Sequence, residues 1–139
     1  MDSNVFAAVV PSWNANNQED RIRAALGLAD GPLPQVQSKW LYRYHEYLAA
    51  HLAFPFEAEY ADDTSGYRQL ILPVTVIALL HPDEHEKHED FGLRCLARRG
   101  KQEIEVPLVD VELKMNSPNG QLLEDYWSWF WNWRFDPRI

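Results

Sequence analysis

The spacing of apolar residues predicts two helices in the first part of the chain. Glu19 and Asp20 follow a run of asparagines, which is typical of a helix start, and they predict a short helix from about Gln18 to Ala29. A second helix is predicted before Pro55, because the residue preceding proline disfavours the helical conformation. Its apolar face recurs at three-to-four spacing, at Trp40, Tyr44, Tyr47, Leu48 and Leu52.

The pattern then changes to strands. Residues 54–60 alternate apolar and acidic positions, which puts Phe56 on one face and Glu57 on the other. The near-continuous apolar run Leu70 to Leu80 predicts a buried strand. Further strands are predicted over Leu93 to Arg98, Glu103 to Val106 and Leu108 to Leu113. Strands joined by short turns favour antiparallel pairing, in a small sheet or an SH3-like barrel.

A last helix is predicted from Leu122 to Trp133, with Glu124 and Asp125 in its first turn, after a break at Asn116 to Gly120. The fold class is therefore α+β, with N-terminal helices, the antiparallel sheet or barrel, and a C-terminal helix. We expect a single domain over residues 1–139, with a helical part at 1–53, a β part at 54–115 and the C-terminal helix at 118–135.

Charge and composition narrow the classes of function. The chain has 13 basic and 21 acidic residues, a formal net charge of −8, which disfavours nucleic acid as a partner. Its single cysteine, Cys95, cannot form an internal disulfide and is expected to be a small buried apolar residue, so a cytoplasmic location is the default. The apolar run at 70–80 is too short for a membrane helix of about 20 residues, and no membrane partner is expected.

The segment His81 to Gly92, HPDEHEKHEDFG, is the strongest candidate for a site. It carries Asp83, Glu84, Glu89 and Asp90 directly after the predicted buried strand. Ca²⁺ takes six to eight oxygen ligands, so clustered carboxylates make a calcium site a candidate, although the charge run alone is more typical of a solvated acidic loop. An EF-hand is excluded: aligning Gly66 with the invariant glycine puts Ala61 and Leu72 where that loop requires acids.

The same segment offers a second kind of metal site. His81, His85 and His88 would lie on one face of a helical turn, and imidazoles suit Zn²⁺ or another transition metal. No nucleophile elbow, phosphate-binding loop or HExxH sequence is present, so an enzyme is not expected. A third alternative is a protein-interaction module that uses the tryptophans of the C-terminal helix, which leaves a protein partner open.

Several short motifs together resemble one family. The helix running into FPFEA at 54–58, the acidic loop that ends at Gly92, the segment PLVDVEL at 107–113 and the terminal EDYWSWFWN at 124–132 are similar to the CcbP-like calcium-binding proteins, which lack EF-hands. The resemblance implies a non-catalytic Ca²⁺ buffer or sensor that binds the ion through side-chain carboxylates. The candidate ligands that it implies are Glu57, Asp83, Glu84, Glu89, Asp90, Asp110, Glu112 and Asp125.

Two details refine this expectation. If 107–113 is a strand, Asp110 and Glu112 share one face and can offer oxygens to one cation. The loop departs from an all-carboxylate pattern, because His81, His85, Lys87 and His88 interrupt the acids. The sequence therefore leaves open which cation the loop prefers.

Overall fold

The structure, a computed structural model, describes residues 17–62, 70–84, 92–113 and 116–134. Within these ranges the helices are α2 (Gln18–Leu26), α3 (Ser38–His51) and α5 (Pro118–Asn132), and the 3₁₀ turns are η3 (Pro82–Glu84) and η4 (Leu108–Asp110). The strands are β1 (Phe56–Asp62), β2 (Leu70–Leu79), β3 (Arg94–Arg99), β4 (Gln102–Pro107) and β5 (Val111–Glu112). This arrangement confirms the predicted α+β class.

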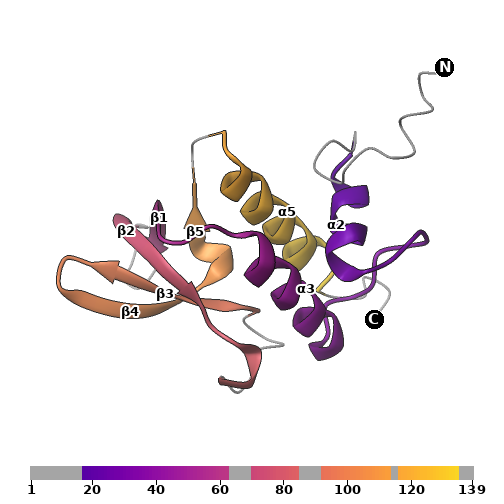
Figure 1. The fold of residues 1–139 in the computed structure, drawn as a ribbon, viewed down its shortest axis with the longest axis horizontal. Helices are drawn as coiled ribbons and strands as arrows, with labels where there is room; N and C mark the ends of the chain where they lie inside the picture. Colours follow the sequence, from indigo (N-terminus) through magenta and orange to yellow (C-terminus); the bar gives the residue numbers. More distant parts are fainter. Residues whose placement is uncertain (1–16, 63–69, 85–91, 114–115, 135–139) are drawn as a thin grey trace.

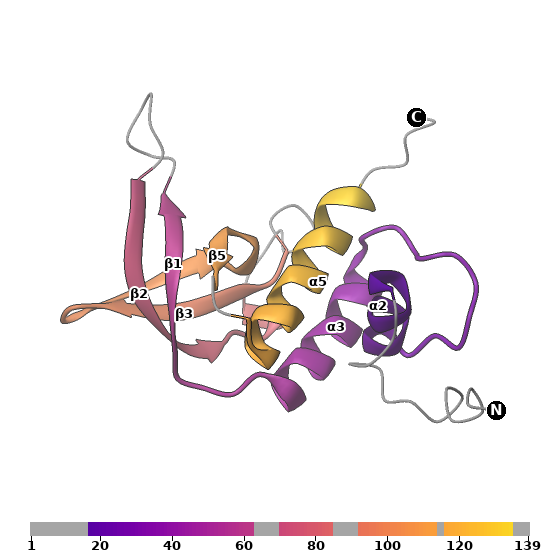
Figure 2. The same cartoon turned by 90° about the horizontal axis from the view of Figure 1, so that it is seen from above.

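The strands form one open antiparallel sheet in the order β4-β3-β2-β1-β5, so the sheet alternative holds and the barrel does not. The helices gather on one side of the sheet, with α3 and α5 nearer to it and α2 farthest away (Figures 1 and 2). None of the helices in the described ranges has the length and apolar character that a bilayer span requires.

The core lies between α3, α5 and the sheet. Tyr44 of α3 packs with its ring centroid 5.2 Å from those of both Tyr126 and Trp129 of α5. Cys95 is fully buried, as predicted, and burial raises the pKa of its thiol to about 12. The other fully buried side chains are apolar and include Ile22, Leu26, Leu41, Leu48, Val76, Leu93 and Phe130.

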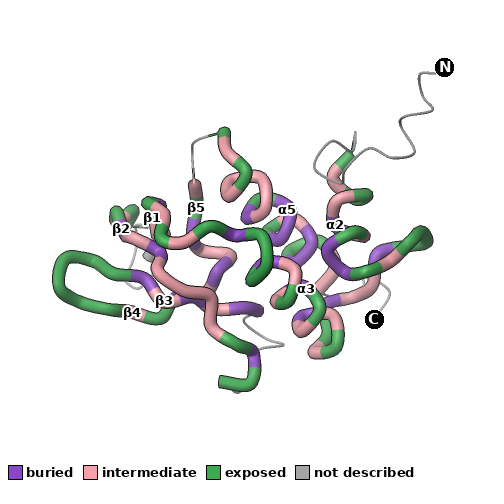
Figure 3. Tube along the Cα trace, viewed as in Figure 1, coloured by how far each residue is buried: buried purple, intermediate pink, exposed green. Residues whose placement is uncertain are grey.

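The strand predicted as buried is covered only in its middle. Val74 and Val76 of β2 are buried, whereas Leu70 and Ile71 are 45% and 50% exposed. The start of β2 and the end of β1 project together beyond the helices (Figure 2), so no helix covers them. Figure 3 shows that the far end of the β3–β4 hairpin is also exposed.

Two helix boundaries differ from the sequence-based ones. α2 ends at Leu26, because Gly27 adopts a left-handed conformation with φ 76° and its N–H bonds back to the carbonyl of Ala24. α5 begins at Pro118, where the range 118–135 expected for the C-terminal helix begins and four residues before the start at Leu122 that the residue pattern predicts, because the Ser117 hydroxyl accepts a hydrogen bond from the N–H of Gly120. The segment read as a strand breaker is thus the cap and first turn of the helix.

The strand predicted over Leu108 to Leu113 is mostly absent. Residues Leu108–Asp110 form η4, and only Val111–Glu112 pair with β1. Residues three apart align in a 3₁₀ turn, so η4 turns both Leu108 and Val111 toward the core, where both are buried. A continuous strand would place them on opposite faces.

A buried ion pair ties α2 to α5. The Asp125 carboxylate is held by Arg21, whose Nε and Nη2 donate at 2.8 and 3.1 Å, and by the amides of Gln18 and Gln121 at 3.0 and 3.3 Å. The Asp125 side chain is 6% exposed and that of Arg21 is 17% exposed. The pair therefore lies largely out of water, where an unmatched charge is costly.

The connection between β2 and β3 is fixed where it re-enters the sheet. Gly92 has φ 75°, and a Cβ atom there would lie 2.5 Å from the Tyr126 hydroxyl and 2.8 Å from the Phe130 ring. The next residue, Leu93, donates its N–H to the Tyr126 hydroxyl at 2.7 Å. Only glycine lets the backbone approach α5 this closely.

Replacing Arg21 by Met should lower the free energy of unfolding by about 3 kcal/mol, because the buried Asp125 carboxylate loses its cation. The double variant Arg21→Met/Asp125→Leu should be less destabilised than Arg21→Met alone. Urea unfolding measures both. Arg98→Met, in an exposed pair with Glu103, is the control and should change stability little. A double variant with a lower free energy of unfolding than Arg21→Met would contradict this account.

Gly92→Ala should lower the free energy of unfolding by about 3 kcal/mol, since the methyl group meets Tyr126 and Phe130 and the backbone is left-handed. Gly100→Ala is the matched control: its φ is 63°, but nothing lies within 4 Å of the added Cβ. It should cost about 1 kcal/mol from backbone strain alone. Equal losses in the two variants, measured by thermal and urea unfolding, would argue against the packing contribution.

Candidate metal centre

The acidic segment joins two adjacent antiparallel strands. Leu80 donates its N–H to the carbonyl of Arg94 at 2.9 Å, which closes the β2–β3 ladder directly before the segment. Asp83 and Glu84 follow in η3, and both side chains are exposed. The other candidates here, Glu89, Asp90, His85 and His88, lie outside the described residues.

Hydrogen bonds within the segment shape η3. The Glu84 carboxylate accepts from the N–H of His81 at 2.7 Å, and the Asp83 N–H donates to His81 Nδ1 at 3.1 Å. The Asp83 carboxylate also accepts a hydrogen bond from the Tyr42 hydroxyl of α3. These contacts orient two carboxylates near the start of the acidic segment.

Helix α3 contributes two residues that sequence reasoning missed. The His81 ring lies 4.8 Å from the ring of His45 and 5.6 Å from that of Tyr42, centroid to centroid. Burial, together with the neighbouring His81, lowers the pKa of His45. The sequence places His45 next to Tyr44, at the buried face of the predicted helix. It gives no sign of the contact with His81, which lies 36 residues away in the sequence.

A second group of carboxylates lies on the sheet. Glu59 of β1 pairs with Glu112 of β5, so these side chains share one face with Glu57, two residues earlier. The Thr75 hydroxyl donates to Glu57 at 2.9 Å. Asp110 lies in η4, so it does not share a strand face with Glu112 as expected. The residue opposite Glu112 is Glu59, which is not among the candidate ligands drawn from the sequence.

The two groups are not brought together. In Figure 1, η3 lies at the lower edge of the molecule beyond β2, and β5 runs toward the upper edge. η3 contacts α3, whereas β5 contacts β1 and α5. The structure thus separates Asp83 and Glu84 from Glu57 and Glu112.

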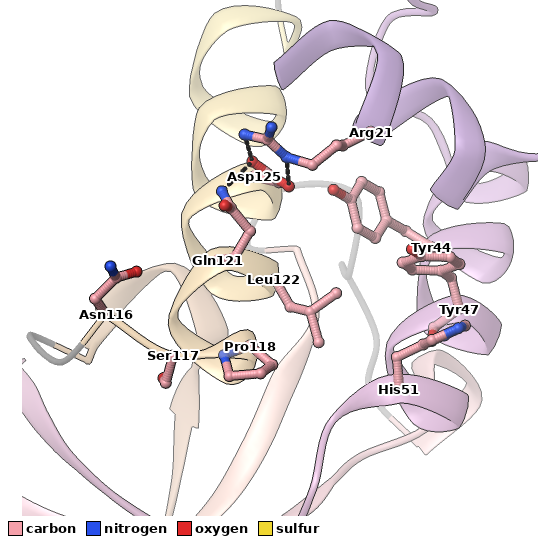
Figure 4. Close-up of a pocket in the computed structure, with 10 residues that line it drawn as sticks. All are labelled: Arg21, Tyr44, Tyr47, His51, Asn116, Ser117, Pro118, Gln121, Leu122 and Asp125. Atoms are coloured by element: carbon pink, nitrogen blue, oxygen red, sulfur yellow. Dashed lines mark hydrogen bonds and ion pairs between the residues drawn. The ribbon is translucent and has the colours of Figure 1, made fainter. Parts of the chain in front are cut away.

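Asp125 lies in a third place, in the middle of α5 instead of its first turn. With Arg21 it forms one end of a cavity of about 750 Å³ between the helices, whose other walls include Tyr47, His51 and Leu122 (Figure 4). The hydrogen bonds from Arg21, Gln18 and Gln121 already occupy both Asp125 oxygens. Its observed role is to join helices.

The tryptophans of the C-terminal aromatic run are divided between the core and the surface. Trp129 is fully buried and donates its ring N–H to the Pro34 carbonyl at 3.0 Å. Trp133 is partly buried, and only Trp127 and Trp131 are markedly exposed, at 50% and 45%. The aromatic run therefore belongs mainly to the core.

The described residues supply part of the oxygen ligands that a calcium site requires. Asp83 and Glu84 supply hard carboxylate oxygens at a solvent-exposed turn, as Ca²⁺ coordination requires. Six to eight oxygens are needed, however, and among the described residues no group of three His, Cys, Asp or Glu side chains already converges on one ion position. The described carboxylates can therefore form only one side of a calcium shell.

Known calcium-binding proteins are similar to this chain in sequence pattern and in fold. A protein-family model for CcbP, described as "Calcium binding", matches residues 36–130. A structure described as a calcium binding protein in the calcium-binding form is 17% identical, with a TM-score of 0.63, covering 86% of this chain and 94% of that one. Anabaena CcbP is 14% identical, with a TM-score of 0.58, covering 85% and 90%. At these identities the structural likeness shows the fold.

A search among curated proteins finds no match. The family match spans the helix α3, the sheet and most of α5, and it contains all the candidate carboxylates. It confirms the resemblance drawn from the sequence motifs. The chain belongs to the CcbP family of calcium-binding proteins.

Proposed function

We propose that this protein binds Ca²⁺ through the acidic segment between β2 and β3 and acts as a non-catalytic calcium buffer. The observation that carries the proposal is the family match over residues 36–130, which includes this segment. Asp83 and Glu84 are the two proposed ligands that lie within the described residues. Glu89 and Asp90, later in the same segment, would add carboxylates to the shell, and backbone carbonyls and water would complete it.

The sheet carboxylates are less suited to a primary site. Glu57, Glu59 and Glu112 project from paired strands, where the ladder engages part of the backbone carbonyls and holds the others in fixed directions. A loop can supply carbonyl as well as carboxylate oxygens. This difference favours the acidic segment over Glu57 and Glu112, and over Asp125, whose oxygens are bonded to Arg21.

The attachment of the segment supports a buffer over a sensor. Its first part is bound to α3 through Tyr42, and its end is fixed to α5 by Gly92 and Leu93. The calcium sensors built from EF-hands work by moving helices apart to expose an apolar groove. Here α3 and α5 already pack on each other through Tyr44, Tyr126 and Trp129, so an ion can bind without separating them.

Substituting Asp83→Asn, Glu84→Gln and Asp90→Asn together should weaken Ca²⁺ binding by about two orders of magnitude, because the site loses most of its anionic oxygens. Isothermal calorimetry with Ca²⁺, and with Mg²⁺ for selectivity, measures the change. The matched control is Glu46→Gln, Glu103→Gln and Glu105→Gln, which removes the same charge from exposed acids outside the segment. Unaltered affinity in the first variant, or equal loss in both, would refute the assignment to the segment.

If the protein is a buffer, Ca²⁺ should leave the helices in place. Amide chemical-shift changes on Ca²⁺ addition should concentrate in residues 81–93 and the adjoining face of α3, and the fluorescence of an added apolar dye should not rise. Dye binding together with shifts throughout α5 would instead indicate a sensor. Trp127 and Trp131 then become the first residues to test as a partner surface.

A further inference from the structure

The contact between His45 and His81 brings two imidazoles together from separate elements. His45 lies on α3, and His81 lies between β2 and η3. Their ring centroids are 4.8 Å apart and the ring planes are inclined by 67°. Neither residue is needed in a shell of carboxylate and carbonyl oxygens, so the calcium site leaves this pair unexplained.

The separation fits two ligands of one metal ion. Two imidazoles that bind a tetrahedral ion through nitrogens about 2.0–2.1 Å from the metal have ring centroids about 5 Å apart. The observed 4.8 Å agrees with this value. A carboxylate also lies beside this pair, which a contact between two rings does not by itself require.

That carboxylate belongs to Asp83. Its Oδ2 lies 3.6 Å from His81 Nδ1. A carboxylate oxygen and an imidazole nitrogen bound to one tetrahedral ion lie about 3.3 Å apart. Within the described residues no three such side chains already converge on one point. A rotation of the Asp83 side chain, which is exposed, can supply the third ligand.

The hydrogen bonding of His81 and Asp83 is compatible with a metal. His81 Nδ1 accepts a hydrogen bond from the N–H of Asp83, so it is the unprotonated nitrogen of this ring, and a metal bound to it replaces that hydrogen bond. Tyr42 donates to the Asp83 carboxylate, as residues that orient a metal ligand commonly do.

We propose that His45, His81 and Asp83 form a binding site for a divalent transition metal such as Zn²⁺, with water as the fourth ligand. Nitrogen ligands suit Zn²⁺ and disfavour Ca²⁺, which takes oxygen ligands. The site therefore differs in chemistry from the proposed calcium site, although Asp83 belongs to both. Zn²⁺ bound here withdraws Asp83 from the calcium shell and weakens Ca²⁺ binding.

The test is titration of the full-length protein with Zn²⁺ alone by calorimetry, comparing the wild type with His45→Gln and His81→Gln. Each substitution should weaken Zn²⁺ binding by at least about tenfold, the smallest loss usual for residues that support a metal. His51→Gln is the matched control, since it changes another α3 histidine that stacks on Tyr47 outside the cluster. It should leave Zn²⁺ affinity unchanged.

Co²⁺ gives an independent readout, because a tetrahedral site with nitrogen ligands produces visible absorption that should disappear in His45→Gln. Circular dichroism and thermal unfolding verify that each variant folds. His45→Gln should bind Ca²⁺ as the wild type does, so failure of the calcium proposal and failure of this one are distinguishable. Wild-type Zn²⁺ affinity in His45→Gln, or Zn²⁺ binding that depends only on His85 and His88, would overturn the proposal.

Discussion

The close approach of Gly92 and Leu93 to Tyr126 is the contact on which the arrangement of sheet, helix and acidic segment depends. It brings the backbone at the start of β3 against the ring of a helical tyrosine, with one buried hydrogen bond from Leu93. The position of β3 then fixes the ladder to β2 through Leu80 and Arg94. As a result, the acidic segment leaves and re-enters the sheet at points set by the core, and its described carboxylates, Asp83 and Glu84, are exposed.

A second set of polar contacts holds the helices to one another. Arg21 and Asp125 join α2 to α5 in a largely buried setting, and Asn119 makes two hydrogen bonds, each of 3.0 Å, to the backbone of Ala53 at the end of α3. These contacts are more strictly directional than the aromatic packing around Tyr44 and Trp129. Together they fix which faces of the helices meet, and so where His45 lies relative to η3.

Local sequence signals predicted the class of fold and most of the elements, because apolar periodicity and turn residues act over a few positions. They failed where a tertiary contact or a cap decided the outcome, as at Leu108, whose burial required a 3₁₀ turn, and at Ser117, whose hydroxyl starts α5. The acidic segment was recognisable from its composition. His45 and Glu59 were not, since each meets its partner only through chain folding.

The charged residues on the β4 edge of the sheet affect the solubility of the metal-loaded protein. In the sheet formed by the described strands, β4 is an edge strand that pairs on one side only, and it carries Gln102, Glu103 and Glu105 as exposed residues. Charged edges discourage strands of other molecules from adding to a sheet. Each bound divalent cation reduces the net charge of −8 by two units, toward the neutrality at which proteins associate. Because the glutamates of β4 are not among the proposed metal ligands, they keep the edge charged while the protein is loaded with metal.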